Sequence, residues 1–403
     1  VQDGVLGASC SGVKISHRPL VSERARPASR LVWLGGHTVS VNPDHGSVVR
    51  IDPSTSARLW ETTIGGEPTT LAVRGSELWV VDREGAQLVV LAADTGRELA
   101  RHALPRASAP FGVVVDPAGA VFVTLEATGE LVRVGADGQI AARASVAPTL
   151  RGLTWFAGRL YATRFLSPDT HGEVHVRDAA TLAALPTLVL PYDRGPDTEA
   201  SGRGVPNYVA EVQISPDGTR GWVASKKDNT ARGSFRDGRT LTFESRVRTI
   251  VSGFDVATSS AALTARLDIN DRDLVLTTLP SRYGELLFVA SQGVNVIDVF
   301  DVAQGRRVSQ FEVGRAPHAL ALDGEARRLA VLNYLSRTVS YYDVSGLLGG
   351  TSNAVVELAT VPTASREVLD AVVLRGKQIF HDAADDRMSR DGYISCSSCH
   401  LDG

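Results

Sequence analysis

Short apolar runs recur along this chain in units of about 40 residues, and this repeat constrains the fold more than any other feature. In each unit an apolar run is followed by a turn at Gly, Asp or Pro and then by a run rich in Val, Leu, Trp or Tyr. Another apolar run, ending in aspartate, comes next, as in residues 48–52 and 339–343. Pro68, Pro110 and Pro148 mark equivalent positions in three successive units. The pattern predicts four β-strands in each unit.

One four-stranded unit cannot bury both of its faces, so the units are expected to pack in a ring. We count seven units, which begin near Pro27, Pro68, Pro110, Pro148, Pro206, Asp273 and Pro317. The sequence therefore predicts an all-β, seven-bladed β-propeller over residues 27–361. Trp79, Trp222 and Phe288 are expected to be buried between blades, and the aspartate-ending runs are expected at the outer edges. A two-sheet β-sandwich with the same strand spacing is the alternative.

Two stretches carry a resemblance to a known family. Residues 207–218 begin Asn-Tyr-Val and end Ser-Pro-Asp-Gly, and residues 294–299 are Val-Asn-Val-Ile-Asp-Val. Both resemble the YVTN-type bacterial β-propellers, and the resemblance covers about residues 27–361. It implies the fold and leaves the function open, because such propellers carry many activities.

Charge and hydropathy exclude some classes of partner. The chain has 42 Lys and Arg, 45 Asp and Glu and a formal net charge of -3, so neither nucleic acid nor an anionic membrane surface is expected to bind. No stretch approaches the roughly 18 apolar residues of a transmembrane helix. The chain begins at Val1, and residues 1–26 are expected to be an extension left by processing. Cys10 is expected to be a free thiol rather than a lipidation site.

The fifth unit contains an insertion, residues 226–243, with five basic side chains. They are Lys226, Lys227, Arg232, Arg236 and Arg239. We expect either a basic lid over one face of the propeller or a solvated loop. The lid would lie on the same face as the C-terminal segment, with at least one basic side chain near a haem propionate or near residues 382–391.

The sequence changes character after the seventh unit. A Pro-Thr-Ala-Ser linker ends at Ser365, which is expected to cap a helix that continues to about Phe380. A polar loop over residues 382–392 leads to residues 396–400, which are Cys-Ser-Ser-Cys-His. Residues 362–403 are therefore expected to start a second domain, a short helical segment like that of a cytochrome c.

The C-x-x-C-H pattern is the attachment signature of c-type haem. Cys396 and Cys399 can each form a thioether to one porphyrin vinyl group, and His400 then supplies the proximal iron ligand. A redox dithiol would be expected in a thioredoxin-like βαβ context, and a zinc site needs a second Cys/His pair. The sequence offers neither, so it predicts one covalent haem c.

The residues around the motif resemble a second family. Residues 375–382, Arg-Gly-Lys-Gln-Ile-Phe-His-Asp, and residues 388–400 are similar to the first haem segment of bacterial di-haem cytochrome c peroxidases and methylamine-utilisation di-haem enzymes. The resemblance covers about 30 residues and implies the same thioether and proximal-ligand roles. Those proteins have further helices and a second haem. Because this sequence ends at Gly403, we expect a longer product or a partner subunit to complete the haem site.

Other polar residues give weaker signals. Met388, the only methionine, is expected to pack against apolar residues, with a role as distal ligand as the alternative, and His381 is a second candidate for that role. His171 and His175 would lie about 13 Å apart on an extended strand, too far to share an ion. The aspartates of residues 382–391 are expected to cap turns rather than bind calcium.

These patterns predict an exported protein, periplasmic or extracellular, because haem c is attached outside the cytoplasmic membrane. Its expected function is electron transfer with a redox partner protein or a small electron donor or acceptor. In a longer product the expected function would be peroxidase-like redox chemistry. The alternative is a non-enzymatic binding or scaffold module in which the propeller docks a protein partner.

Overall fold

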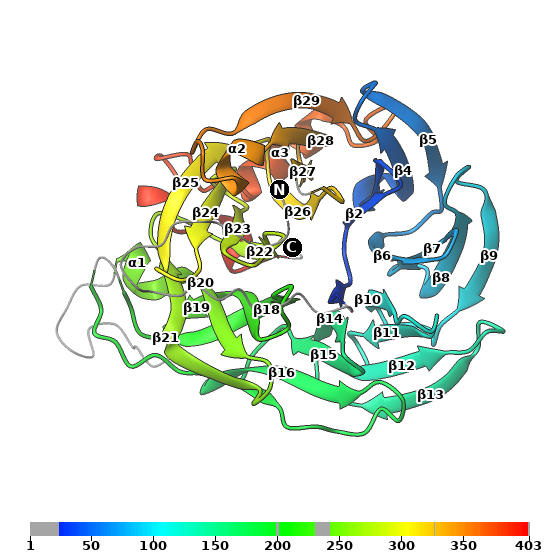
Figure 1. Ribbon diagram of the computed structural model, residues 1–403, viewed down its shortest axis with the longest axis horizontal. Helices are drawn as coiled ribbons and strands as arrows, with labels where there is room; N and C mark the ends of the chain where they lie inside the picture. The colour runs from blue at the N-terminus through cyan, green and yellow to red at the C-terminus, as the bar shows by residue number, and fades with distance from the viewer. Residues whose placement is uncertain (1–23, 199–200, 230–241, 326, 402–403) are drawn as a thin grey trace, which may run out of the picture.

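The computed structural model describes residues 24–198, 201–229, 242–325 and 327–401. In these residues, seven antiparallel sheets stand around a common axis (Figure 1). Six sheets have four strands, and the fourth blade has a fifth strand at its inner edge. The predicted seven-bladed β-propeller is confirmed, and the two-sheet sandwich is wrong.

Within each blade the strands run outward from the axis in chain order (Figure 1). The strands are β1 Arg26–Pro27; β2 Leu31–Leu34, β3 His37–Asn42, β4 Ser47–Asp52, β5 Ala57–Thr63; β6 Pro68–Arg74, β7 Glu77–Asp82, β8 Gln87–Ala92, β9 Glu98–Ala103; β10 Pro110–Val115, β11 Val121–Leu125, β12 Glu130–Val134, β13 Ile140–Ser145; β14 Leu150–Phe156, β15 Arg159–Arg164, β16 His171–Asp178, β17 Leu188–Pro191; β18 Val205–Ile214, β19 Arg220–Asp228, β20 Val247–Asp255, β21 Ser260–Ile269; β22 Val275–Pro280, β23 Leu286–Ser291, β24 Val296–Asp301, β25 Arg306–Glu312; β26 Pro317–Leu322, β27 Arg328–Asn333, β28 Thr338–Asp343, β29 Val356–Pro362. The helices and 3-10 turns are η1 Pro43–His45, α1 Phe243–Arg246, α2 Ser345–Leu348, α3 Ala371–Phe380, η2 Arg390–Gly392 and η3 Cys396–Ser398.

Burial along the strands follows from their position in the ring. β11 is buried at every position, whereas the outermost strand of the same blade, β13, alternates between half-buried and exposed residues. An inner strand is covered on both faces by neighbouring blades, so a continuous apolar run is favourable there. The outer strand also meets solvent, which permits alternation with the two-residue period of a strand.

The predicted core aromatic residues lie where the sequence placed them. Trp79, Trp222 and Phe288 are all buried. Each belongs to an apolar cluster drawn from two neighbouring blades, the second and third for Trp79 and the fifth and sixth for Trp222. Phe288 joins the sixth blade to the seventh. Contact between blades therefore accounts for the large apolar residues of the repeats.

The first blade starts at Leu31, later than the predicted Pro27. Pro27 belongs instead to β1, which pairs with β14 of the fourth blade, so the chain crosses the axis before the ring begins (Figure 1). The N–H of Ala28 donates to the carbonyl of Leu153 at 2.8 Å. The inner edge of β14 offers unpaired backbone groups, and an added edge strand tolerates a proline.

The aspartate-ending runs are third strands, β4 and β28, rather than the outer edges that the sequence suggested. The outermost strands are β5 and β29. The first and last blades share no sheet, so the ring closes through side chains. One apolar cluster draws Leu31 from the first blade and Tyr341 from the last, and Thr38 Oγ1 lies 2.6 Å from the Tyr341 hydroxyl.

The predicted helix after the propeller is shorter than expected. α3 begins at Ala371, where Asp370 accepts the N–H of Val372 at 2.8 Å, so Asp370 is the cap rather than Ser365. Glu367 accepts the N–H of Leu369 at 2.9 Å and pairs with Arg337 at 3.0 Å, which holds the preceding residues in a turn. In the described ranges, no helix combines the length and apolar character that crossing a membrane would require.

Candidate functional site

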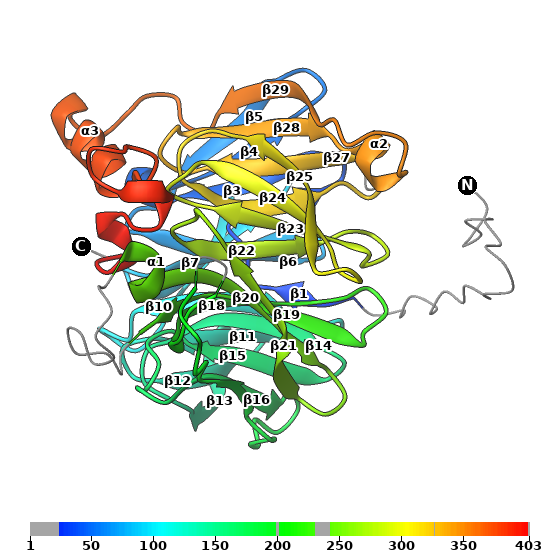
Figure 2. The same ribbon diagram turned by 90° about the vertical axis from the view of Figure 1, so that its left-hand side faces the viewer.

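The C-terminal segment, residues 377–401, lies along one face of the propeller (Figure 2). Lys377 Nζ is 2.7 Å from an oxygen of Asp44 in the first blade, and Gln378 donates to the carbonyl of Leu335 in the seventh at 3.1 Å. Further along, Arg248 of the fifth blade lies 5.5 Å from the ring of Tyr393. The segment therefore contacts both ends of the closed ring as well as its later blades.

A buried carboxyl group anchors the segment to the sixth blade. Asp273 is fully buried and accepts the N–H of Gly293 at 2.8 Å. The hydroxyl of Ser395 lies 3.3 Å from its other oxygen. Ser395 also lies 2.8 Å from the hydroxyl of Ser397. Asp273 therefore connects the propeller to the residue that precedes the C-x-x-C-H motif.

The motif itself presents its reactive side chains outward. Cys396–Ser398 forms a 3-10 turn, and the N–H of His400 donates to the carbonyl of Cys396 at 3.0 Å. Both cysteines are free thiols and exposed, and the imidazole of His400 is exposed as well. The two serines between the cysteines are fully buried. Two accessible thiols and an adjacent accessible imidazole fit the chemistry of thioether attachment and proximal ligation.

The backbone after the second cysteine is fixed at the axis of the propeller. The Tyr208 hydroxyl donates to the carbonyl of Cys399 at 2.7 Å. The ring of Tyr208 stacks on Phe165 at 4.6 Å. Leu401 packs against the apolar cluster that contains both rings. The motif is therefore attached on one side through Ser395 and on the other through Cys399 and Leu401.

Gly293→Ala is expected to loosen this attachment. A methyl group at Gly293 would lie within 3 Å of the Asp273 carboxylate and of the carbonyl oxygen of His381, so the segment would have to move. We expect amide hydrogen exchange in residues 381–400 to become at least tenfold faster, while the propeller strands keep their protection. Gly376→Ala, whose added methyl meets no atom within 4 Å, is the control. Unchanged exchange in Gly293→Ala would show that the contact does not hold the segment.

Burial raises the pKa of Asp273 to about 7, which predicts a pH dependence. Between about pH 4 and pH 7 the folded carboxyl keeps a proton that the unfolded chain has released. The stability of the parent should therefore fall as the pH rises through this window. Asp273→Asn is expected to reduce that loss by the part that Asp273 contributes, measured as the difference in unfolding free energy between pH 5 and pH 8, whereas the similar contribution of Glu211 remains. Asp94→Asn, at an exposed turn, should keep the parental difference, and a parental difference in Asp273→Asn would contradict the prediction.

The two candidate distal ligands, Met388 and His381, have different surroundings. Met388 is 47% exposed, so the apolar packing expected for it is wrong. His381 is buried, and its Nδ1 lies 2.9 Å from the carbonyl oxygen of Lys377 at the end of α3. Among the described residues, no three His, Cys, Asp or Glu side chains are placed to hold a metal ion. A distal ligand therefore stays a prediction.

The described ends of the fifth-blade insertion lie on the predicted face, since α1 is beside the C-terminal segment in Figure 2. The expected role of its first two lysines is wrong, however. Lys227 Nζ is 2.7 Å from Asp193 and 2.9 Å from Asp268, and Lys226 pairs with Asp228 at 3.0 Å. Both lysines are therefore paired with aspartates of the propeller. Three further basic residues, Arg232, Arg236 and Arg239, lie outside the described residues, as does Cys10.

Two further groups of polar residues make polar contacts in the structure. Glu173 lies between His171 and His175, at 2.9 and 3.4 Å, and also pairs with Arg164. This arrangement is a hydrogen-bonded cluster on β16. In residues 382–391, Asp382 pairs with Arg315 at 3.1 Å, and Asp382 and Asp385 accept backbone N–H groups.

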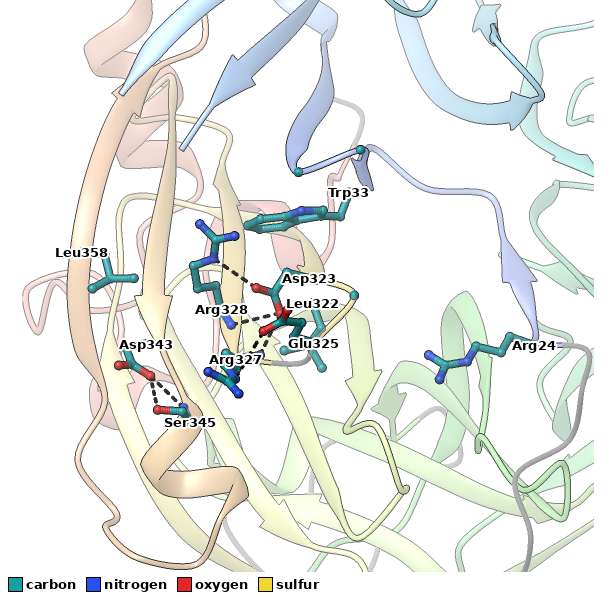
Figure 3. Close-up of a pocket in the computed structure, with 13 residues that line it drawn as sticks. Arg24, Trp33, Leu322, Asp323, Glu325, Arg327, Arg328, Asp343, Ser345 and Leu358 are labelled. Carbon is teal, nitrogen blue, oxygen red and sulfur yellow. Dashed lines mark hydrogen bonds and ion pairs between the residues drawn. The ribbon is translucent and has the colours of Figure 1, made fainter. Parts of the chain in front are cut away.

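An open groove of about 760 Å³ lies near the surface of the first and seventh blades (Figure 3). Ser345 of α2 lines it, and α2 lies on the side of the ring opposite the C-terminal segment (Figure 2). Trp33 forms one wall, with the Arg328 guanidinium 5.2 Å from its ring. Arg328 also pairs with Asp323 at 3.0 Å. The groove is therefore distant from the motif and has balanced charges.

Comparison with known proteins defines the class as a seven-bladed β-propeller. Hydrazine synthase of Kuenenia stuttgartiensis is similar with a TM-score of 0.67 and 14% identity, over 83% of this chain and 99% of that one. A chain of the Mitotic Checkpoint Complex gives 0.53 and 13%, over 92% of both chains. A streptogramin B lyase gives 0.50 and 12%, over 78% of this chain and 93% of that one. At these identities the likeness shows the fold alone.

No protein-family model and no curated protein sequence matches the chain. The YVTN resemblance and the di-haem resemblance therefore stay predictions from short stretches of sequence. Sequence reasoning also missed Asp273 as an anchor and Leu401 as a contact at the axis. A buried aspartate that opens a blade carries no motif, and only the folded ring brings residue 273 next to residue 395.

Proposed function

We propose that this chain is a haem c-carrying β-propeller that transfers electrons. The observation that supports it best is the arrangement of residues 396–400, in which both thiols and the imidazole are exposed while the intervening serines are buried against the propeller. Each thiol would add across one vinyl group, forming a C–S bond and giving its proton to the other vinyl carbon. The bound haem would supply one-electron chemistry at its iron.

In this proposal the propeller positions the motif. Asp273 holds Ser395, and Tyr208 holds the carbonyl of Cys399. Both are positioning residues, because they act on the backbone and side chains that flank the cysteines. His400 would be the proximal ligand, and Met388 is the proposed distal candidate. The rigid blades would keep the group at one fixed place for a redox partner protein or a small electron donor or acceptor.

The proposal includes location and scope. Attachment of haem c takes place outside the cytoplasmic membrane, so we propose a periplasmic or extracellular protein. Peroxidase-like chemistry would require a second haem site, which a longer product or a partner subunit would have to supply.

A second candidate function is a scaffold that docks a protein partner. The observation that favours it is α3, none of whose residues is buried. Val372 is 79% exposed and Val373 56%. The propeller in the Mitotic Checkpoint Complex belongs to a protein assembly, so this fold is compatible with such a role.

The test is direct and separates the two functions. The chain is expressed with a cytochrome c maturation system and examined by pyridine haemochrome spectroscopy after acid–acetone extraction. Electron transfer predicts one non-extractable haem per chain that is reduced and reoxidised reversibly. If the chain folds but carries no covalent haem, the electron-transfer function is refuted and the scaffold function remains.

A further inference from the structure

The innermost strands enclose a small cavity at the axis of the propeller. Its volume is about 60 Å³, and Leu401 of the C-terminal segment contributes to its wall. The ionisable side chains that line it are Arg30, Arg151, Glu211 and His318. None of the motif residues 396–400 is among its lining residues, so this cavity is distinct from the proposed haem site.

The cavity is lined by a cation whose charge is only partly compensated. Arg151 is buried, and its Nε lies 2.7 Å from a carboxylate oxygen of Glu126. In the described part of the chain, the carboxylates whose charges act on Arg30 are those of Glu211 and Glu67, and their effect on its pKa is smaller than that of burial and Arg151. Burial and the neighbouring charge of Arg151 lower the pKa of Arg30. Arg30 is half-buried, and a cation that has lost part of its water is unfavourable unless an anion or hydrogen-bond acceptors compensate it.

The other ionisable groups of the cavity supply only part of the negative charge that would compensate Arg30. Burial raises the pKa of Glu211 to about 7, so near neutral pH its carboxyl is protonated for much of the time. Burial also lowers the pKa of His318 well below its ordinary value, which keeps the imidazole neutral. The Nε2 atom of His318 is buried without a hydrogen-bond partner in the described structure. A small polar ligand would satisfy such a group.

The shape of the lining restricts the ligand. The guanidinium carbons of Arg30 and Arg151 lie 5.8 and 5.0 Å from the centre of the Phe111 ring, so both cations border the same aromatic side chain. The volume corresponds to about two water molecules, which excludes phosphate esters and aromatic acids. A planar oxyanion can accept two parallel hydrogen bonds from one guanidinium.

We propose that this axial cavity binds a small planar monoanion, a carboxylate or oxyanion of the size of formate or nitrite, against the guanidinium of Arg30. The anion compensates the charge of Arg30, and Leu401 covers it from the side of the C-terminal segment. Binding does not require haem, so this proposal and the proposed function can fail separately.

The experiment is calorimetric titration of the full chain with sodium formate and sodium nitrite, in a background of sodium gluconate at one fixed pH. Gluconate is too large for the cavity and keeps the ionic strength constant. We expect saturable binding of at least one anion with one site per chain. The Cys396→Ala/Cys399→Ala variant should bind with the parental affinity. Absence of saturable binding of both anions to the folded parent would overturn the proposal and indicate a cavity that holds only water.

Variants assign the site to Arg30. Arg30→Met is expected to weaken binding at least tenfold, and Arg30→Gln, which keeps a hydrogen-bond donor without the charge, serves if the methionine variant does not fold. Arg327→Met is the control, because this arginine pairs with Glu325 at the surface, where its side chain is 71% exposed. Parental affinity in a folded Arg30 variant, or an equal loss in the control, would place the binding elsewhere.

Discussion

The variant Cys396→Ala/Cys399→Ala is expected to carry no covalent haem, whereas the parent carries one haem per chain. Each thioether needs one thiol, and both thiols of the motif are free and exposed. The loss should be complete by haem staining of denatured protein and by the absence of a c-type pyridine haemochrome band. The fold should be kept, because both cysteines are exposed, whereas the residues buried in this turn are Ser397 and Ser398.

Two controls make this result specific. Cys10→Ala removes the third cysteine of the chain and should leave haem loading at the parental level. His400→Ala should retain whatever haem becomes attached but change its absorption spectrum, because only the proximal nitrogen is removed. Covalent haem in the double variant, or a parent without haem under the same expression conditions, would refute the proposed attachment site.

Lys227→Met is expected to destabilise the propeller by about 3 kcal/mol. The lysine side chain is fully buried, and its ammonium lies between Asp193, which follows the fourth blade, and Asp268 of the fifth. Its removal leaves two carboxylates facing each other away from solvent. Arg266 and Arg248 lie 3.8 and 3.7 Å from these carboxylates and compensate part of the charge, so the effect should lie at the lower end of the range for broken buried pairs.

Urea unfolding measures this effect, and pH adds a second readout. Burial alone would raise the pKa of Asp193, but the hydrogen bonds from Lys227 and from the Gly195 N–H, together with the charges of Lys227 and Arg266, outweigh burial and hold the pKa below its ordinary value. The parent should therefore lose stability as the pH falls below about 4, and Lys227→Met should lose less.

The matched control is Lys377→Met. Lys377 pairs with Asp44 but is 30% exposed, so its removal should cost about 1 kcal/mol or less. A Lys227→Met variant within 1 kcal/mol of the parent would show that the buried lysine is not structurally important.

The sequence alone was sufficient to predict the ring. Strand period, turn residues and the 40-residue repeat are local properties, so seven blades and the interblade positions of Trp79 and Phe288 could be predicted before any contact was known. The C-x-x-C-H pattern is equally local, because its five residues and their spacing are read directly from the chain. The turn that this motif forms is also local in sequence, and its geometry is compatible with the predicted chemistry.

Only the tertiary structure decided which distant residues meet. Pairing of β1 with β14, the contact of Asp273 with Ser395 and the placing of Lys227 between two aspartates each join segments far apart in the chain. No local preference encodes them, since they depend on how the blades close around the axis. The sequence suggested that Lys227 was available to a haem propionate, because a basic run is usually solvated. Burial in the ring made it a structural cation instead, and the same closure enclosed Arg30 at the axis.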